Sequence, residues 1–457
     1  MKKILIATSF LLFSINSGFA QNDAEMIRKI YDEVLQNGQA YEQLRFLTKQ
    51  IGPRLTGSPQ AAAAVDWTKE AMEDLGFDNV FLQEVLVPHW VRGEKEEARI
   101  LNSRKLGTVE VDVTALGNSI GTGPEGILGN VVEVQNFLEL LKLGEEGIKG
   151  KIVFFNRRMD PKSVSTFAAY GMAGDQRRSG PSEAAKFGAV AVLVRSLTQV
   201  IDDNPHTGGT RYQEDAPKIP AAAISTEDAE FLSLLLKEEP DLKFYLRTNA
   251  MMKKEKLSHN VIGELKGSEK PDEYIAIGGH LDSWDLAEGA HDDGAGCVQS
   301  IEVLRALKAI GYKPKRTLRA VMFMNEENGL RGGRKYAEMA EVNKEKHLAA
   351  MESDRGGFTP KGFTLDMDER KLKRIQAWKY LFEPYKIFEF EAGGGGADIG
   401  PLKSQNVPLI GFKPDDQRYF KYHHTQIDTF DKVDERELHM GAATMAALVY
   451  LIDKYGL

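Results

Sequence analysis

The sequence predicts an α/β protein, in which a mixed, mostly parallel sheet is sandwiched by helices and interrupted by an inserted β-rich domain. Short, almost purely apolar runs alternate with segments of helical periodicity, as in sheets covered by helices on both faces. This alternation weakens between residues 115 and 250, where glycine and proline punctuate the chain, and returns from about residue 258. His, Asp and Glu follow the later apolar runs.

The N-terminus has the layout of a secretory signal peptide. Lys2 and Lys3 precede an apolar run that ends near the small residues Gly18 and Ala20. We expect cleavage after Ala20 and export of the mature protein to a periplasm or to the outside of the cell. A membrane anchor would need a longer apolar run. A lipoprotein anchor is not expected, because no cysteine lies near the cleavage site.

Length, charge and cysteine content limit the function of the mature chain. Cleavage leaves 437 residues (457 minus 20), which suggests two or three domains. The formal charge changes from -8 to -10 when Lys2 and Lys3 are removed, so there is no electrostatic basis for nucleic-acid binding. Cys297 is the only cysteine, which excludes an intramolecular disulfide and a thiolate metal cluster. Any metal site must therefore use His, Asp and Glu.

Residues 21–114 are expected to form the first part of the main domain. Ser58 is a good N-cap, Pro59 suits the first helical position, and Gly76 suits the position after the last turn. These signals predict a helix between Ser58 and Gly76. The run VFLQEVLV at residues 80–87 then predicts a strand.

Residues 115–250 are expected to form the inserted domain. The runs GKIVFFN at 150–156 and GAVAVLV at 188–194 are short and apolar, as buried strands are. A helix is expected to begin at Ser225 or Thr226. We expect this domain to shape or cover the mouth of an active site.

Residues 251–457 are expected to complete the main domain. Four apolar runs predict strands at residues 273–279, 318–324, 348–353 and 407–412. A helix with apolar residues at helical spacing is expected to end at Gly311. The last helix begins with a capping box formed by Asp434 and Glu437.

Side chains that can bind metals follow each of these four strands. They are His280, Asp282, Asp292 and Asp293 after the first, Glu326 and Glu327 after the second, Asp354 after the third, and His423 and His424 after the fourth. Ligands of open α/β sheets bind outside the carboxyl ends of the strands, so we expect these residues to meet. Oxygen and imidazole ligands without thiolates suit zinc, or less often cobalt or manganese. The sequence therefore predicts a metal site.

Each of these features also has an ordinary structural interpretation. Asp282 alone could be a turn residue, and two adjacent glutamates could be a solvated helix start, where carboxylates favour the helix dipole. A single histidine at position 423 or 424 could lie on the surface. Their joint placement at the ends of four strands favours the metal site.

The ordered set of motifs resembles the co-catalytic zinc exopeptidases, a family that includes secreted aminopeptidases and glutamate carboxypeptidases. The likeness extends along nearly the whole mature chain. Its motifs include GPRLTGS, GNSIGTGPEGI, GHLDSWD, DDGAG, MESDRGGF and HHTQIDT. The inserted region similarly looks like a protease-associated domain. The resemblance implies two Zn²⁺ ions per subunit, a peptide substrate and a homodimer. No nucleic-acid partner is expected from the acidic charge, and no membrane partner is expected because nothing after the signal peptide resembles a spanning helix.

The resemblance also implies a role for each site residue. The implied metal ligands are His280, Asp292, Glu327, Asp354 and His424, with Asp292 bridging the two ions. Glu326 would be the general base, and Asp282 would hold the His280 ring in place. The peptide bond between Asp292 and Asp293 is expected to be cis. His423 would face the substrate or have a structural role, and Asp398, in a glycine-rich loop, would lie on the substrate-binding rim.

These roles assign different tasks to the adjacent glutamates. Glu327 would bind metal, while Glu326 would take a proton from metal-activated water during hydrolysis of a dipeptide or short peptide. The resemblance favours a substrate with both termini free. A broad-specificity aminopeptidase is an alternative that shares every metal ligand. A binding protein that keeps the fold without activity is a second alternative, which the complete ligand set disfavours.

Overall fold

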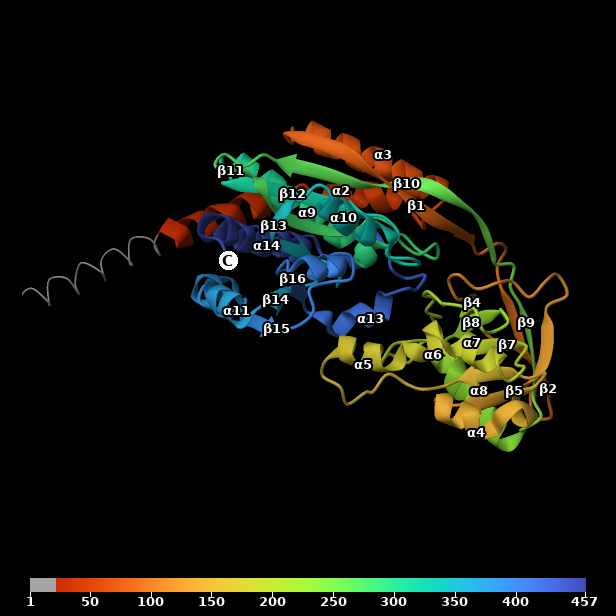
Figure 1. The fold of residues 1–457 in the computed structure, drawn as a ribbon. Helices are drawn as coiled ribbons and strands as arrows, with labels where there is room; N and C mark the ends of the chain where they lie inside the picture. Colours follow the sequence, from red (N-terminus) through yellow and green to blue (C-terminus); the bar gives the residue numbers. More distant parts are fainter. Residues whose placement is uncertain (1–21) are drawn as a thin grey trace, which may run out of the picture.

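The computed structural model describes residues 22–457, and the signal peptide expected at residues 1–20 lies outside this range. Two eight-stranded sheets organise the described chain. Figure 1 shows the larger sheet and its helices in one layered body, and the smaller sheet with its own helices in a second body beside it. Both sheets are mixed, so the predicted α/β class is confirmed.

The larger sheet has the strand order β1-β10-β12-β11-β13-β16-β14-β15. The bounds are β1 Asn79–Val91, β10 Met251–Leu265, β11 Lys270–His280, β12 Arg316–Phe323, β13 Lys346–Glu352, β14 Pro360–Asp366, β15 Glu389–Ala392 and β16 Leu409–Pro414. Its centre, β12-β11-β13-β16, is parallel, while β1 and β10 pair antiparallel at one edge. The four strands predicted from apolar runs in residues 251–457 are these central strands.

Helices cover both faces of the larger sheet because the side chains of its central strands alternate between two hydrophobic cores. On β11, Ile275 and Ile277 belong to the core that contains α3, α9 and α14, whereas Ala276 belongs to the core that contains α10. The bounds are α3 Pro59–Asp74, α9 Ala295–Ala309, α10 Arg331–Val342 and α14 Glu435–Tyr455. The other helices of this body are residues 22–37, α2 Ala40–Phe46, α11 Glu369–Gln376, α12 Lys379–Phe382 and α13 Tyr419–Tyr422.

The predicted helix signals act where they were expected. The Ser58 hydroxyl accepts a hydrogen bond from the backbone N–H of Ala61, and Pro59 begins α3. Asp434 caps α14 by accepting from the N–H of Glu437. Cys297 is buried within α9. These caps begin α3, which packs on β1 and β10, and α14, which packs on α9 and β14.

The smaller sheet has the order β3-β2-β9-β5-β6-β7-β8-β4. Its bounds are β2 Glu97–Ser103, β3 Gly107–Glu110, β4 Val113–Ala115, β5 Ile127–Val134, β6 Ile152–Phe155, β7 Ala191–Arg195, β8 Ala221–Ile224 and β9 Lys243–Arg247. Helices α4 Phe137–Ile148, α5 Thr166–Ala173, α6 Asp175–Arg178, α7 Gly180–Ala185 and α8 Thr226–Glu238 belong to the same part of the chain. The sheet begins at Glu97, earlier than the boundary expected at residue 115, because β2 pairs with β9.

Two long strands of the larger sheet join the two bodies. β1 leads into the smaller sheet and β10 returns from it, and the two pair along almost their whole length. Figure 1 shows this pair extending from the larger body toward the smaller one. Among residues 22–457, no helix has the length and apolar character needed to cross a bilayer.

Candidate metal centre

His280 lies at the carboxyl end of β11 and faces two carboxylates. Its Nδ1 donates a hydrogen bond to the backbone carbonyl of Asp282, at 2.9 Å. This leaves Nε2 available as a ligand atom, at 3.2 Å from Oδ1 of Asp292 and 3.6 Å from Oδ1 of Asp354. The ligand atoms of these three residues lie within 4.8 Å of one another. They form one candidate metal position.

A second group lies on the other side of Asp292. Nε2 of His424 is 3.3 Å from Oδ2 of Asp292 and 3.1 Å from Oε2 of Glu327. Asp292 therefore directs Oδ1 toward His280 and Oδ2 toward His424. A carboxylate with its two oxygens aimed at two groups of ligand atoms has the geometry expected of a bridging ligand.

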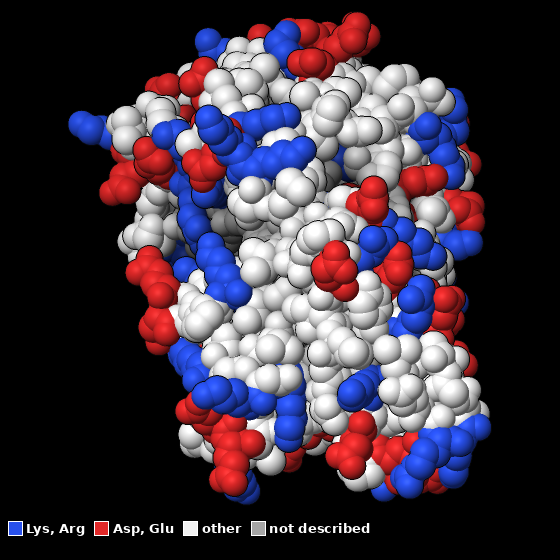
Figure 2. Space-filling view, turned by 90° about the vertical axis from the view of Figure 1, so that its right-hand side faces the viewer, with Lys and Arg blue, Asp and Glu red and all other residues white. Residues whose placement is uncertain are grey.

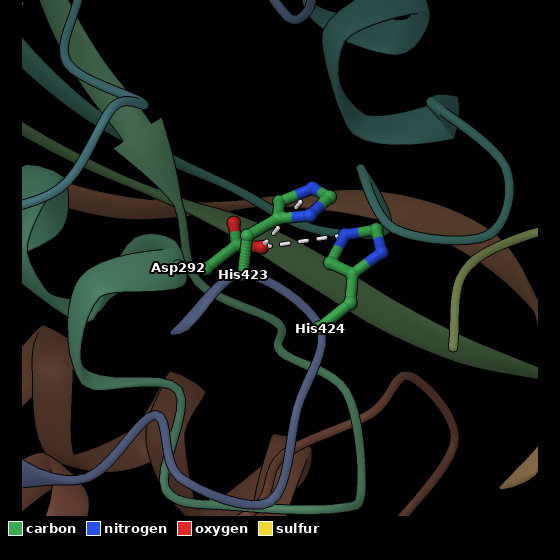
Figure 3. Close-up of side chains that lie close together, drawn as sticks. All are labelled: Asp292, His423 and His424. Carbon is green, nitrogen blue, oxygen red and sulfur yellow. Dashed lines mark ion pairs between the residues drawn. The ribbon is translucent and has the colours of Figure 1, made fainter. Parts of the chain in front are cut away.

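His423 lies in the same group as His424, at a greater distance from the bridging carboxylate. Figure 3 shows both imidazoles beside Asp292, with Nε2 of His423 3.9 Å from Oδ2. The two rings stack with their centroids 3.5 Å apart. His424 makes the shorter approach and also meets Glu327. The substrate contact implied for His423 stays a prediction.

The two glutamates follow β12 on a turn that Asp282 holds. The Asp282 carboxylate accepts hydrogen bonds from the backbone N–H groups of Asn325 (2.7 Å), Glu326 (3.0 Å) and Glu327 (3.4 Å). Asn325 has a φ of 75°, in the left-handed region that asparagine tolerates better than most residues. Glu327 is then directed inward, where its Oε1 accepts from the N–H of Trp284 at 3.2 Å. Glu326 and Glu327 both also line an open cleft.

Asp282 holds the His280 ring as predicted, but it does so through its backbone carbonyl and not through its carboxylate. The backbone carbonyl of Asp282 accepts the hydrogen bond from the ring, while the nearest carboxylate oxygen is 3.8 Å from Nδ1. The carboxylate instead holds the glutamate turn, because three N–H groups converge on it. One residue therefore ties the end of β11 to the end of β12.

Two further aspartates hold the backbone around the bridging residue. Asp293 accepts from the N–H of His280 at 2.9 Å, and the Asp292–Asp293 peptide bond is cis, as expected. Asp428 accepts from the N–H groups of His291 (2.8 Å) and Asp292 (3.1 Å). Sequence reasoning gave Asp428 no role, although it lies in the HHTQIDT motif four residues after His424.

Asp398 is fully buried, and the rim position implied for its loop stays a prediction. Its side chain is packed against Gly333, where an added Cβ would lie 2.8 Å from Oδ1. Neighbouring backbone N–H groups, those of Ala397 and Ile399, donate to the buried carboxylate of Glu352 at 2.9 and 2.8 Å. The loop therefore turns its aspartate inward.

The charges of the centre favour divalent cations. Burial opposes the ionisation of Asp292, yet the contact with His280 and the nearby His424 and His423 hold its pKa below the ordinary value. Burial and the charge of Asp354 raise the pKa of Glu326 to about 8, against the effect of His280. Oδ2 of Asp292 and Oδ1 of Asp354 are buried without hydrogen-bond partners. The buried carboxylates of the centre outnumber its cationic side chains, and two of their oxygens have no hydrogen-bond partner. Zinc ions fit as the missing partners of these oxygens.

The smaller body supplies the hydrogen-bond partner of a predicted metal ligand, which the sequence analysis did not foresee. Nδ1 of His424 lies 3.2 Å from the carbonyl oxygen of Thr207, and the N–H of Thr207 donates to the carbonyl of His424 at 3.0 Å. Nη1 of Arg177 donates to the same Thr207 oxygen at 3.3 Å, and Nη2 donates to the hydroxyl of Tyr170. These contacts orient the His424 ring with Nε2 toward Asp292.

Comparisons with known proteins agree with this geometry. The family model for peptidase family M28 matches residues 260–449, which contain every predicted metal ligand. Carboxypeptidase Q from Bos taurus is 35% identical over 413 residues, covering 90% of this chain and 85% of the relative. Carboxypeptidase Q from Xenopus laevis is 36% identical with the same coverage.

A solved structure resembles the whole architecture. The peptidase M28 precursor from Shewanella amazonensis is 33% identical with a TM-score of 0.90, covering 95% of this chain and 97% of that one. Its coverage includes both bodies of the present structure. The likeness therefore extends beyond the metal centre to the inserted sheet.

Proposed function

Because this chain belongs to the carboxypeptidase Q-like branch of peptidase family M28 and is a zinc metallopeptidase, we propose that it is an exported exopeptidase that cleaves dipeptides or short peptides at two zinc ions. The observation that carries this proposal is the position of Asp292, which presents one oxygen to each of two ligand groups. We propose in particular that the enzyme binds two ions, cleaves a short substrate, is exported, and uses Glu326 for proton transfer.

The ligand assignment follows from the ligand groups around Asp292. His280 and Asp354 would hold one ion, Glu327 and His424 the other, and Asp292 both. When bound, the ions would polarise the peptide carbonyl and make a water molecule more acidic. The hydrogen bonds to the carbonyls of Asp282 and Thr207 keep Nδ1 of each histidine protonated, so that each Nε2 lone pair is free.

Glu326 is the residue we assign to proton transfer. Its backbone is held next to Glu327 by the Asp282 carboxylate, and the residue also lines a cleft between the two bodies. In this position the carboxylate can accept the proton of the attacking water and pass it to the nitrogen of the leaving amine.

Product analysis of one dipeptide in three forms tests the proposal. The zinc-loaded mature protein is incubated with the free, the N-acetylated and the C-amidated dipeptide, and products are identified by mass spectrometry. We expect cleavage of the free form alone, because both termini would be recognised. Cleavage of the amide as well would favour the aminopeptidase alternative. Cleavage of the acetylated form would indicate a carboxypeptidase that ignores the amine, and no cleavage of any form would contradict the proposal.

A further inference from the structure

Arg54 is a fully buried arginine whose side chain is bonded to backbone carbonyls. Its Nε donates to the carbonyl of Leu281 at 2.6 Å, Nη1 to that of Glu288 at 2.6 Å, and Nη2 to that of Gly289 at 2.9 Å. Figure 2 shows Lys and Arg side chains on the surface of the molecule, interspersed with Asp and Glu. Arg54 differs from them, because within residues 22–457 it forms no ion pair with an Asp or Glu. Burying a charge is unfavourable, so a cation held by carbonyls indicates a specific task.

The three carbonyls lie at the two ends of one loop, residues 281–289. Leu281 follows the predicted ligand His280 directly, and Gly289 lies three residues before the bridging Asp292. The guanidinium group therefore ties together the two ends of the loop that joins these two ligands. A lysine cannot replace it, because an ammonium group concentrates its donors on one nitrogen while a guanidinium spreads them over a planar fork.

Thr56, two residues after Arg54, makes a comparable contact with the glutamate turn. It is fully buried, and its Oγ1 accepts from Nδ2 of Asn325 at 3.1 Å and donates to Oδ1 of Asn328 at 3.1 Å. These two asparagines flank Glu326 and Glu327 in the sequence. The hydroxyl of Thr56 therefore holds the turn from the side opposite in sequence to its strand.

Both contacts come from one short segment that contains no predicted ligand. Residues 52–57 join the helical segment Leu47–Ile51 to α3. Gly52 and Gly57, at its two ends, both have a φ of 83°, which glycine adopts without strain. The backbone N–H of Arg54 also donates to Oγ of Ser283, at 3.2 Å. The segment thus contacts the loop after β11 and the turn after β12 at the same time.

We propose that residues 52–57 form a brace that fixes the loop leading to Asp292 and the turn carrying Glu327 relative to each other, with Arg54 and Thr56 as positioning residues for the metal centre. The inference rests on the proposed function, because it takes these two ligands as zinc-binding residues. The brace would hold the ligands of both groups in place before an ion binds. Loss of either contact should therefore weaken zinc binding in a protein that is still folded.

The test compares Arg54→Lys and Thr56→Val with the matched controls Arg316→Lys and Thr317→Val. Arg316 and Thr317 are also buried, and their side chains donate to backbone carbonyls at 2.7 and 2.8 Å. They lie at the start of β12, at the opposite end of the strand from the glutamates. Zinc affinity is measured on each apoprotein by competition with a chromogenic chelator, after circular dichroism has shown that it is folded. The visible absorption of the cobalt(II)-loaded proteins then reports the ligand geometry.

We expect Arg54→Lys to lower zinc affinity by about ten- to a hundredfold, as for the loss of a group that orients metal ligands. Thr56→Val should lower it by about fivefold, the equivalent of one hydrogen bond. Both variants should change the cobalt spectrum, and neither control should. If Arg54→Lys does not fold, Thr56→Val decides alone. Wild-type zinc affinity in the folded brace variants, or losses equal to those of their controls, would overturn the inference.

Zinc binding separates this inference from the proposed function, because it is measured without a peptide. If wild type binds zinc but cleaves no dipeptide, while the brace variants bind zinc more weakly than their controls, only the proposed function fails. If wild type cleaves dipeptides and the brace variants match their controls in zinc affinity, the inference is wrong and the function stands.

Discussion

At the scale of single residues, the centre depends on side chains that hold the backbone of the predicted ligands. Asp282 is the best example, because its buried carboxylate accepts from three N–H groups of the glutamate turn. A carboxylate with several N–H donors is a strong acceptor, and an amide in its place offers only one oxygen. The positions of Glu326 and Glu327 therefore depend on a residue that belongs to neither ligand group.

Replacing Asp282 tests this dependence. We expect Asp282→Asn to lower the free energy of unfolding by about 1–3 kcal/mol, as for the loss of buried hydrogen bonds to a charged group. Turnover should fall as well, because the glutamate turn is no longer held. Chemical denaturation measures the stability. Asp272→Asn, at an exposed position of the same strand β11, is the control. Equal stability of the two variants would contradict the assigned role.

His347 provides a test of burial that is independent of the metal centre. Its Nε2 lies 2.7 Å from the hydroxyl of Tyr336, and burial, with the charge of Arg319, lowers its pKa to about 3. The unfolded chain therefore binds a proton at this histidine below about pH 6.5, while the folded protein does not. Wild-type stability contains a contribution from His347 that is complete above pH 6.5 and declines as the pH falls toward 3.

The variant His347→Gln removes this titration. Between pH 6.5 and pH 5, we expect the unfolding free energy of wild type to fall relative to the variant by about 1.4 kcal/mol per pH unit. Denaturation curves at pH 7.5, 6.0 and 5.0 give the difference directly. A difference that stays constant across these pH values would mean that His347 does not remain neutral in the folded state.

The residues that come together at the centre could be predicted from the sequence. The contacts that hold them in place could be predicted much less well. His280, Glu327 and Asp354 could be found because they directly follow or end apolar strands, and strand ends in an open parallel sheet converge. Thr207 could not be found in this way. It acts through its backbone carbonyl, and a carbonyl gives no signal in side-chain chemistry.

At the scale of elements, α6 and the segment around Thr207 connect the smaller body to a predicted metal ligand. Arg177, in α6, donates to the Thr207 oxygen that also faces Nδ1 of His424. Gly208, beside Thr207, has a φ of 134° and no room for a side chain, since a Cβ there would lie 2.4 Å from the Arg177 guanidinium. The segment is therefore shaped to pack on Arg177.

Arg177→Met tests this connection. We expect zinc affinity to fall by about tenfold, because a loosened Thr207 carbonyl no longer orients the His424 ring. Affinity is measured by competition with a chromogenic chelator, and circular dichroism checks the fold. Arg178→Met is the matched control, since Arg178 is the next residue along the chain and is exposed. Equal zinc affinity in the two variants would mean that the smaller body does not support the site.

The boundary of the smaller body illustrates what local patterns omit. Its sheet begins at Glu97, but β2 pairs with β9, which lies more than a hundred residues later in the chain. The boundary is expected at residue 115 because the alternation of apolar runs weakens there, and this local change does not reveal which strands pair. The apolar runs of β6 and β7 were easier to predict, because buried parallel strands need no knowledge of their partner.

At the scale of the whole molecule, the two bodies meet at the candidate metal centre. The larger sheet supplies the predicted ligands and Glu326, while the smaller body supplies Thr207 and one wall of the cleft. The alternation of apolar runs predicted the larger body, and its weakening from residue 115 predicted a second one. The two bodies share one site through contacts between residues far apart in the sequence. For example, Nδ2 of Asn118 donates to the backbone carbonyl of Asn328 at 3.2 Å.

The most direct test of this account is a comparison of Glu326→Gln with Glu327→Gln for zinc content and turnover. Zinc is counted by mass spectrometry after dialysis, and turnover is measured on a free dipeptide. We predict that Glu326→Gln keeps the wild-type zinc content while kcat falls by at least about a hundredfold, as for loss of a general base. Glu327→Gln should lose zinc. Loss of zinc in Glu326→Gln, or wild-type kcat in that variant, would contradict the division of tasks between the two glutamates.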